Sequence, residues 1–237
     1  MKMRNPEERA HVRRLETMPH LQYKIIRSKR KSLSITVDRN GEVLVRAPLR
    51  VSNSAIDRFV EEKKAWIART RRRIAEFDAS HPPMSISEGG NLMFMGRYYG
   101  VVRTDSVDIA ISGNTIRIPR HYDGSKVVAW MKAEASHVIG ERVSHYAAVT
   151  KLTPLSIRLT NARTRWGSCG GAGGVNFTWR LILCPLPVID YVVVHELCHL
   201  VHRNHGRHFW ESVENILPQY KEAENWLKDN GKLIRMI

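Results

Sequence analysis

The stretch HELCH at His195–His199 carries two histidines and a glutamate at a spacing that can bind and use a metal ion. Residues four apart on an α-helix lie on one face, so His195 and His199 can direct both imidazoles at one point. Glu196 is rotated by about 100° from His195, so it borders that point without joining the ligand pair. There a carboxylate can take a proton from activated water and pass it to a leaving group. This is the chemistry of a metallohydrolase.

A catalytic zinc site needs a third protein ligand, and the sequence offers several. His202 shares a helix face with His199, but three ligands on successive turns span about 10 Å of rise, too far for one ion. His205 falls at the expected end of the helix, where Gly206 gives the backbone freedom to turn back. His208 and a distant carboxylate are the alternatives. Histidine ligands also suit Ni²⁺, Co²⁺ or Fe²⁺, so the residue types leave the metal open.

The run VIDYVVV before His195 is apolar, which predicts a buried helix. A buried pair of histidines with a glutamate needs partners, so a bound metal is favoured over a cluster held only by hydrogen bonds. Cys198 points away from the direction of both histidines, and we interpret it as a small packing residue.

Periodicity predicts the elements that position this motif. A hairpin turning at Asn40-Gly41 is followed by one long basic helix, then by four short strands, a second long helix and paired strands joined by GGAGG. The motif helix and two further helices complete the chain. The expected strands are 23–28, 32–38, 42–48, 91–96, 97–104, 107–112, 115–120, 155–169 and 175–184, and the expected helices are 51–78, 125–149, 188–203, 208–217 and 220–231.

These elements indicate an α+β fold in which a subdomain with the HELCH helix beside a β-hairpin follows a β-rich subdomain. The expected divisions are a basic extension at 1–20, the β-rich subdomain with its basic helix at 21–121, and the metallopeptidase-like subdomain at 122–237.

The charge of the chain is uneven. The net charge is +15, and residues 1–73 hold 20 Lys and Arg against 8 Asp and Glu. Such an excess is compatible with a polyanion partner, nucleic acid or nucleotide, but a purely solubilising role is the stronger expectation because net charge bears on partners only loosely. The three cysteines form no CxxC pair, no run is apolar enough to span a membrane, and no signal peptide precedes the fold, so a cytoplasmic protein is expected.

Several longer motifs resemble the YgjP-like metallopeptidase family, which is related to the SprT-like and Wss1-like zinc proteases. They occur in the family's order, and the likeness covers about residues 21–230. The motifs are RSKRKSLSITVDRNGEVLVRAP, FMGRYYGV, RWGSC at Arg165–Cys169, NFTWRL at Asn176–Leu181, YVVVHELCHL at Tyr191–Leu200 and NHGxxFW at Asn204–Trp210.

The resemblance implies a zincin-like metallopeptidase fold for the second subdomain, with the HELCH helix as its active-site helix. It also implies that His195, His199 and His205 bind the metal and that Glu196 is the catalytic acid and base. The spacing is shared with the metzincins, but their glycine falls where His202 stands, which excludes that group. The GGAGG insert is expected to loosen the hairpin after RWGSC.

Three functions follow from these residues. The leading hypothesis is a zinc metallopeptidase whose cleft edge is the strand bearing Arg165, Trp166 and Ser168, to which an extended peptide adds. In the alternative reading, Trp166 is a core anchor and Arg165 pairs with a carboxylate. The second hypothesis is a UTP-type nucleotide pyrophosphohydrolase. The third is a nucleic-acid-associated binding module with proteolysis confined to proteins met there.

Overall fold

The chain forms two compact units, Met1–His81 and Pro82–Ile237, in a computed structural model that describes residues 21–38 and 40–235. The expected boundary at 121/122 is therefore displaced to 81/82. The reason is that the four strands after residue 90 pack on the segments that follow them in the chain, through η1 (Trp179–Leu183) and Trp130. The basic extension predicted for residues 1–20 lies outside the described residues. Within the described ranges, no helix has the length and apolar character to cross a membrane.

The first unit is a three-stranded sheet covered by helices. Its strands are β1 (Tyr23–Ser28), β2 (Ser34–Val37) and β3 (Val43–Pro48), in the order β1-β3-β2. The hairpin predicted at Asn40-Gly41 is confirmed, because β2 and β3 pair antiparallel and Gly41 has a φ of 76°. β1 pairs parallel with β3, which makes β3 the central strand.

The single long helix expected at 51–78 is two helices, α1 (Asn53–Glu62) and α2 (Lys64–Ser80). Lys63 separates them, and its N–H is shared between the carbonyls of Phe59 and Val60. Ser52 caps α1 by accepting a hydrogen bond from the N–H of Ala55. The core of this unit joins the apolar face of β3 to both helices through Val43, Val45, Ala47, Ile56, Val60 and Ile67.

The second unit begins with a four-stranded sheet in the order β4-β5-β7-β6. The strands are β4 (Asn91–Phe94), β5 (Arg97–Thr104), β6 (Ala110–Ser112) and β7 (Thr115–Pro119), close to the predicted segments. β5 and β7 pair parallel, although the other neighbours are antiparallel. Phe94 stacks on Trp130 of the following helix at a centroid distance of 5.1 Å, so this sheet belongs to the second unit.

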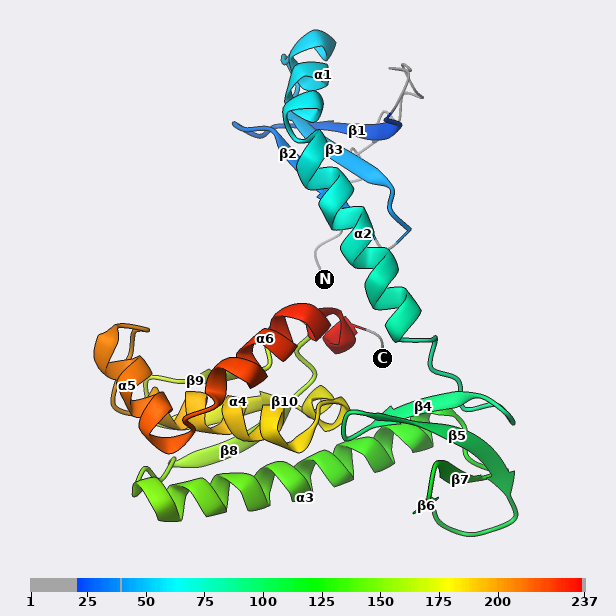
Figure 1. The fold of residues 1–237 in the computed structure, drawn as a ribbon, viewed down its shortest axis with the longest axis vertical. Helices are drawn as coiled ribbons and strands as arrows, with labels where there is room; N and C mark the ends of the chain where they lie inside the picture. The colour runs from blue at the N-terminus through cyan, green and yellow to red at the C-terminus, as the bar shows by residue number, and fades with distance from the viewer. Residues whose placement is uncertain (1–20, 39, 236–237) are drawn as a thin grey trace, which may run out of the picture. The chain divides into compact units, whose positions relative to one another are not determined.

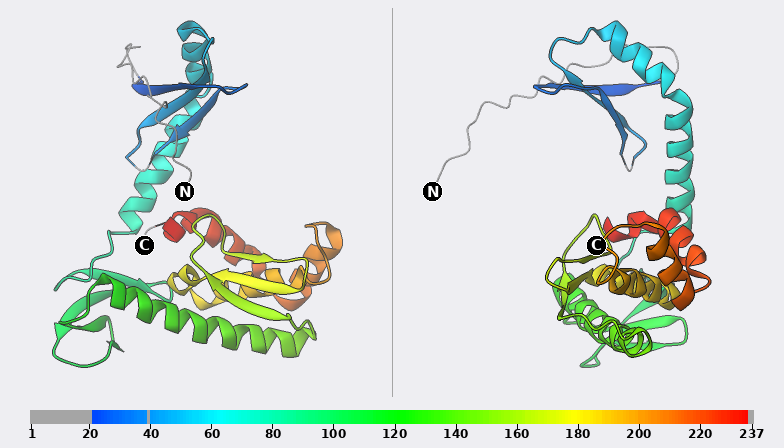
Figure 2. Two further views of the ribbon diagram at one scale, coloured as in Figure 1. Left: turned by 180° about the vertical axis from the view of Figure 1, so that it is seen from behind. Right: turned by 90° about the vertical axis from the view of Figure 1, so that its left-hand side faces the viewer.

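The long helix α3 (Gly124–Thr150) supports the rest of this unit. Asp123 caps it by accepting from the N–H of Lys126, and its inward face repeats every four residues at Val127, Met131 and Ala135. α4 (Leu186–Cys198) packs on α3 and on α6 (Tyr220–Asn230), and Figures 1 and 2 show α4 between the two. α5 (Arg207–Ile216) and a 3-10 turn, η2 (Gly231–Arg235), complete the unit.

A second sheet, in the order β8-β10-β9, lies beside α4. Its strands are β8 (Ser156–Thr160), β9 (Gly167–Cys169) and β10 (Gly174–Thr178). The predicted strand at 155–169 is thus two strands, of which β8 pairs parallel and β9 antiparallel with β10. The predicted strand at 175–184 is wrong in its second half, since Trp179–Leu183 forms a 3-10 helix, η1. All five side chains of η1 are buried, so an alternating strand with one exposed face does not fit this segment.

Candidate metal centre

The helix α4 is fixed at its start by the turn between β4 and β5. The N–H groups of Met95 and Gly96 donate to the carbonyls of Ile182 and Leu183, at 2.7 and 3.0 Å. Gly96 has a φ of 77°, and a Cβ there would lie 2.5 Å from Cγ of Pro185, the residue that precedes α4. Only glycine therefore allows this close approach.

The middle of α4 is held against α3. Arg142 donates two hydrogen bonds to the carboxylate of Asp190, at 2.5 and 3.0 Å. Around this pair the apolar run of α4 is buried, as the sequence predicts, with Val188, Ile189 and Val193 each at most 3% exposed. α4 is thus a rigid support for the residues at its C-terminal end.

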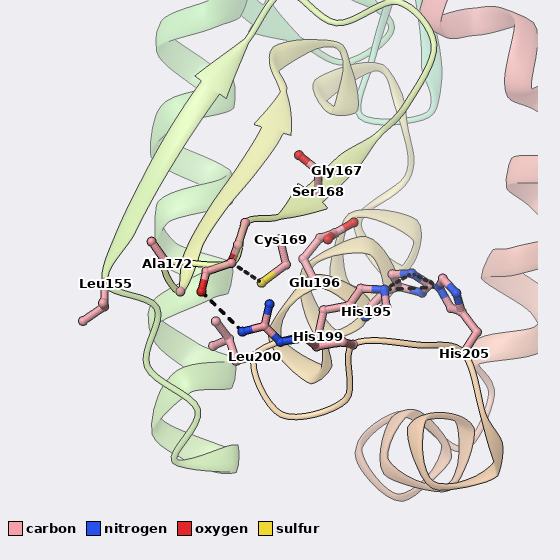
Figure 3. Close-up of a pocket in the computed structure, with 14 residues that line it drawn as sticks. Leu155, Gly167, Ser168, Cys169, Ala172, His195, Glu196, His199, Leu200 and His205 are labelled. Carbon is pink, nitrogen blue, oxygen red and sulfur yellow. Dashed lines mark hydrogen bonds between the residues drawn. The ribbon is translucent and has the colours of Figure 1, made fainter.

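The three histidines predicted as ligands, His195, His199 and His205, converge at the C-terminal end of α4. The Nε2 atom of His195 lies 3.2 Å from that of His199 and 3.0 Å from that of His205, and the remaining pair is 3.2 Å apart. Nitrogen ligands at 2.0–2.1 Å from one tetrahedral ion would be about 3.3 Å apart. Figure 3 shows the rings directed at one another. The spacing therefore fits one metal ion.

The protons of these rings support the same interpretation. Nδ1 of His199 lies 2.8 Å from the carbonyl oxygen of His202, which can only accept, so the ring carries its proton there. With that proton at Nδ1, Nε2 is the atom of His199 that faces the two other Nε2 atoms. Burial lowers the pKa of His195 to about 3, with smaller contributions from His199 and His205, so the ring of His195 is neutral. Neutral imidazoles with converging lone pairs are what a divalent metal binds.

Packing around the rings keeps them in place. Phe209 is fully buried and stacks on His199 at a centroid distance of 4.5 Å, and it makes T-shaped contacts with His195 and His205. Trp210 lies beside His205 at 5.8 Å. These are the two aromatic residues of the NHGxxFW motif, which therefore orients the histidines.

The other histidines of this region do not join the cluster. Nε2 of His202 lies 3.1 Å from the hydroxyl of Ser212, and its carbonyl already accepts from His199. The exposed His208 pairs with Glu211 at 3.1 Å. In the part of the chain that the structure describes, the group of three that can hold an ion is His195, His199 and His205.

The helix that carries the motif ends earlier than predicted, and this brings the third histidine into reach. α4 ends at Cys198, with His199 as its last cap residue, instead of continuing to residue 203. The N–H groups of Leu200 and Val201 then bond three residues back, which tightens the turn and redirects the chain. Cys198 is fully buried and packs in the core, consistent with its predicted packing role.

Glu196 lies against the strand β9. A Cβ at Gly167 would lie 2.5 Å from Oε1 and 2.7 Å from Cγ of Glu196, so the glycine of RWGSC makes room for this side chain. Glu196 is 6% exposed, and burial raises its pKa to about 7. Oε2 has no hydrogen-bond partner among the described residues. A buried carboxyl with a pKa near neutrality and a free oxygen suits proton transfer.

These residues line one cavity of about 640 Å³. Its floor is the end of α4 with the three histidines and Glu196, and its wall is β9 with the glycine-rich turn to β10 (Figure 3). That turn is closed by hydrogen bonds, because the N–H of Gly170 donates to Gly174 and the N–H of Gly173 donates to Gly170. The GGAGG segment is therefore an ordered cleft wall rather than a loosened hairpin.

β9 is an open edge beside the cluster, since β10 is its single neighbour among the described strands. The carbonyl of Trp166 accepts from Thr178, and the N–H of Gly170 donates to Gly174. Hydrogen-bonded pairs alternate in antiparallel strands, so the N–H and C=O groups of Gly167 and Cys169 point toward the open edge. They are available to an extended peptide.

The three predicted cleft residues are divided between two hollows. Ser168 lines the cavity that contains the three histidines. Exposed Arg165 and half-buried Trp166 instead line a second hollow of about 210 Å³. Gly167 and Ser168 border both hollows. The sequence did not predict that Arg203, in the segment after α4, lines the same cavity as the three histidines. Its position two residues before His205 was the available signal.

Residues 31–230 match the YgjP-like family, described as a metallopeptidase domain. The chain belongs to this family. No curated protein and no solved structure matches it. Membership implies a divalent metal, and the convergent histidines of this chain provide a site for one.

Proposed function

We propose that the protein is a zinc-dependent metallopeptidase that uses Glu196 as its acid and base. The observation that carries this proposal is the meeting of three Nε2 atoms within 3.2 Å of one another beside the open edge of β9. His195, His199 and His205 would hold the ion. Zinc at such a site supplies Lewis acidity toward a carbonyl oxygen and toward water.

The residues of the chain divide the remaining work. The open edge of β9 aligns an extended peptide through the main-chain groups of Gly167 and Cys169. Glu196 accepts a proton at its unpartnered Oε2 atom and later donates it to the departing amine. Gly167 holds that carboxyl at the base of the strand, so the proton acceptor lies beside the peptide that the strand aligns.

The donor set favours a peptidase over a nucleotide pyrophosphohydrolase. Phosphoryl transfer commonly uses Mg²⁺ bound by carboxylates. The described residues offer one group of metal-binding side chains, and it consists of histidines alone. Histidine ligands suit zinc and related transition metals.

A nucleic-acid contact through the first unit remains a second proposal. Arg69, Arg72 and Arg73 of α2 are exposed and form no ion pair with the described residues. Binding of a fluorescent DNA strand should then weaken steeply as salt rises and should persist in Glu196→Gln. A flat response to salt would exclude this contact.

The peptidase proposal is tested by two variants of the full chain. Glu196→Gln should keep its zinc and lose about 10²- to 10⁴-fold in peptide cleavage, because it removes the proton carrier alone. His199→Ala should lose both zinc and activity. Zinc content by elemental analysis, and turnover of casein, peptides and UTP by the zinc-loaded proteins, provide the measurements. Retained turnover in Glu196→Gln would contradict the role of the carboxylate.

A further inference from the structure

Besides Glu196, a second charged side chain, Arg203, lines the cavity that contains the three histidines. It belongs to the segment between α4 and α5, and its Nη2 atom donates to the carbonyl of Gly171 at 3.4 Å. This bond connects the segment after α4 to the glycine-rich turn between β9 and β10, the part of the cavity wall where Figure 3 labels Ala172. Arg203 therefore stands where β9 runs into its turn, at the other end of the strand from Gly167.

The charge of Arg203 is not neutralised within the described part of the chain. It forms no ion pair there, and the single carboxylate lining the cavity is Glu196, to which the proposed mechanism assigns the proton transfer. Both charges act on the thiol of Cys169, whose pKa is raised mainly by burial, raised further by Glu196 and lowered by Arg203. The cation and the proton carrier thus lie on the same cleft surface, with a cysteine of β9 near both.

The direction of β9 determines which part of a bound peptide reaches Arg203. An antiparallel strand pairs slightly better than a parallel one, so a peptide added at the open edge runs opposite to β9. Its amino-terminal end then lies at the turn beside Arg203. Its scissile bond lies near Glu196, which packs against Gly167.

We propose that Arg203 selects peptides with an acidic side chain on the amino-terminal side of the scissile bond. This rests on the proposed peptidase function and names its substrate class. The guanidinium can bind a carboxylate through two parallel hydrogen bonds. Leu200 and Ala172 line the same part of the cavity and provide apolar surface for the aliphatic stem of a glutamate.

The test is a cleavage profile of the zinc-loaded full chain on a mixed peptide library, read by mass spectrometry and aligned on the broken bond. Asp and Glu should be enriched about fivefold on the amino-terminal side, the upper end of what an exposed ion pair supplies. Arg203→Glu should replace this preference with Lys and Arg. The matched control is Arg207→Glu, which changes the net charge equally at an exposed residue of α5 outside the cavity.

A profile with no acidic enrichment, or one that Arg203→Glu leaves unchanged, would overturn the proposal. If no peptide is cleaved at all, the peptidase function fails, and a binding measurement then decides the role of Arg203. In the zinc-loaded Glu196→Gln protein, a fluorescein-labelled glutamate-rich peptide should bind about fivefold more weakly after Arg203→Glu than after Arg207→Glu. Equal losses in both variants would show that only net charge attracts the peptide and would refute the assignment.

Discussion

Replacing Gly167 by alanine is the sharpest test of how Glu196, the proposed proton carrier, is positioned. The added Cβ would lie 2.5 Å from Oε1, 2.7 Å from Cγ and 2.8 Å from Cδ of Glu196. Carbon contacts are comfortable at about 3.5–4.0 Å, so the side chain must move by about 1 Å. Because Cγ is among the contacts, rotation of the carboxylate tip alone does not relieve the clash. The φ of Gly167 lies outside the left-handed region, so alanine is otherwise allowed.

The expected loss follows from this displacement. A misplacement of about 1 Å in an active site costs about 10²-fold in rate. Overpacking at a buried position costs about 1–3 kcal/mol in the free energy of unfolding. The three atoms nearest to the new Cβ all belong to Glu196 and none to a histidine, so zinc content should stay unchanged.

The assay compares kcat/KM for one peptide, zinc content and denaturant unfolding in Gly167→Ala and in a matched control, Gly140→Ala. Gly140 lies within α3, and a Cβ there meets nothing within 4 Å. The control should keep its activity and gain about 0.5–1 kcal/mol, because alanine is the better helix residue.

A double-mutant cycle separates the clash from any other effect of the alanine. Glu196→Ala removes the three atoms nearest to the new Cβ, so Gly167→Ala should destabilise that background by at least about 1 kcal/mol less than it destabilises the wild type. Additive free energies in the cycle, or full activity in the single variant Gly167→Ala, would refute the view that Gly167 positions Glu196.

Three further predictions concern the support of the site. Added zinc should raise the unfolding midpoint of the metal-stripped wild type and of His208→Ala but not that of His205→Ala, as thermal melts with and without zinc would show. Gly96→Ala should cost about 2–3 kcal/mol in urea unfolding, because its φ is 77° and the Cβ collides with the residue before α4. Arg142→Met should cost about 2 kcal/mol and be largely rescued by Asp190→Leu, since the first change alone leaves the carboxylate of Asp190 without its cation between α3 and α4; additive losses would contradict this.

The candidate site could be predicted from the sequence because its information is local. The spacing of His195, His199 and Glu196 sets their directions on a helix before any tertiary contact is known. The rejection of His202 as a ligand followed from the rise of a straight helix. That helix ends at Cys198, however, so His202 does not lie on a straight helix and its rise along the axis is not what excludes it. His202 lies outside the cluster because its ring contacts Ser212 and its carbonyl accepts from His199.

The parts of the fold that the sequence did not predict depend on contacts between distant segments. The parallel pairing of β8 with β10 leaves no mark on the alternation of either strand. The burial of every side chain of η1 made a 3-10 turn resemble an inner strand. The division of the chain at His81 arises because the four-stranded sheet packs on η1 and α3, and periodicity within that sheet carries no information about its neighbours.

The motifs that carry the family resemblance have a common physical role in this structure. Gly96 of FMGRYYGV lets a turn approach Pro185, the residue before α4. Gly167 of RWGSC lets β9 approach Glu196, near the C-terminal end of α4. Both positions would place a Cβ about 2.5 Å from the helix or the residue before it. The aromatic residues of NHGxxFW, Phe209 and Trp210, pack against the histidine rings beyond its end. The motifs outside HELCH therefore position one helix at three places along its length, which is why they accompany the candidate metal ligands and, apart from His205, add none to them.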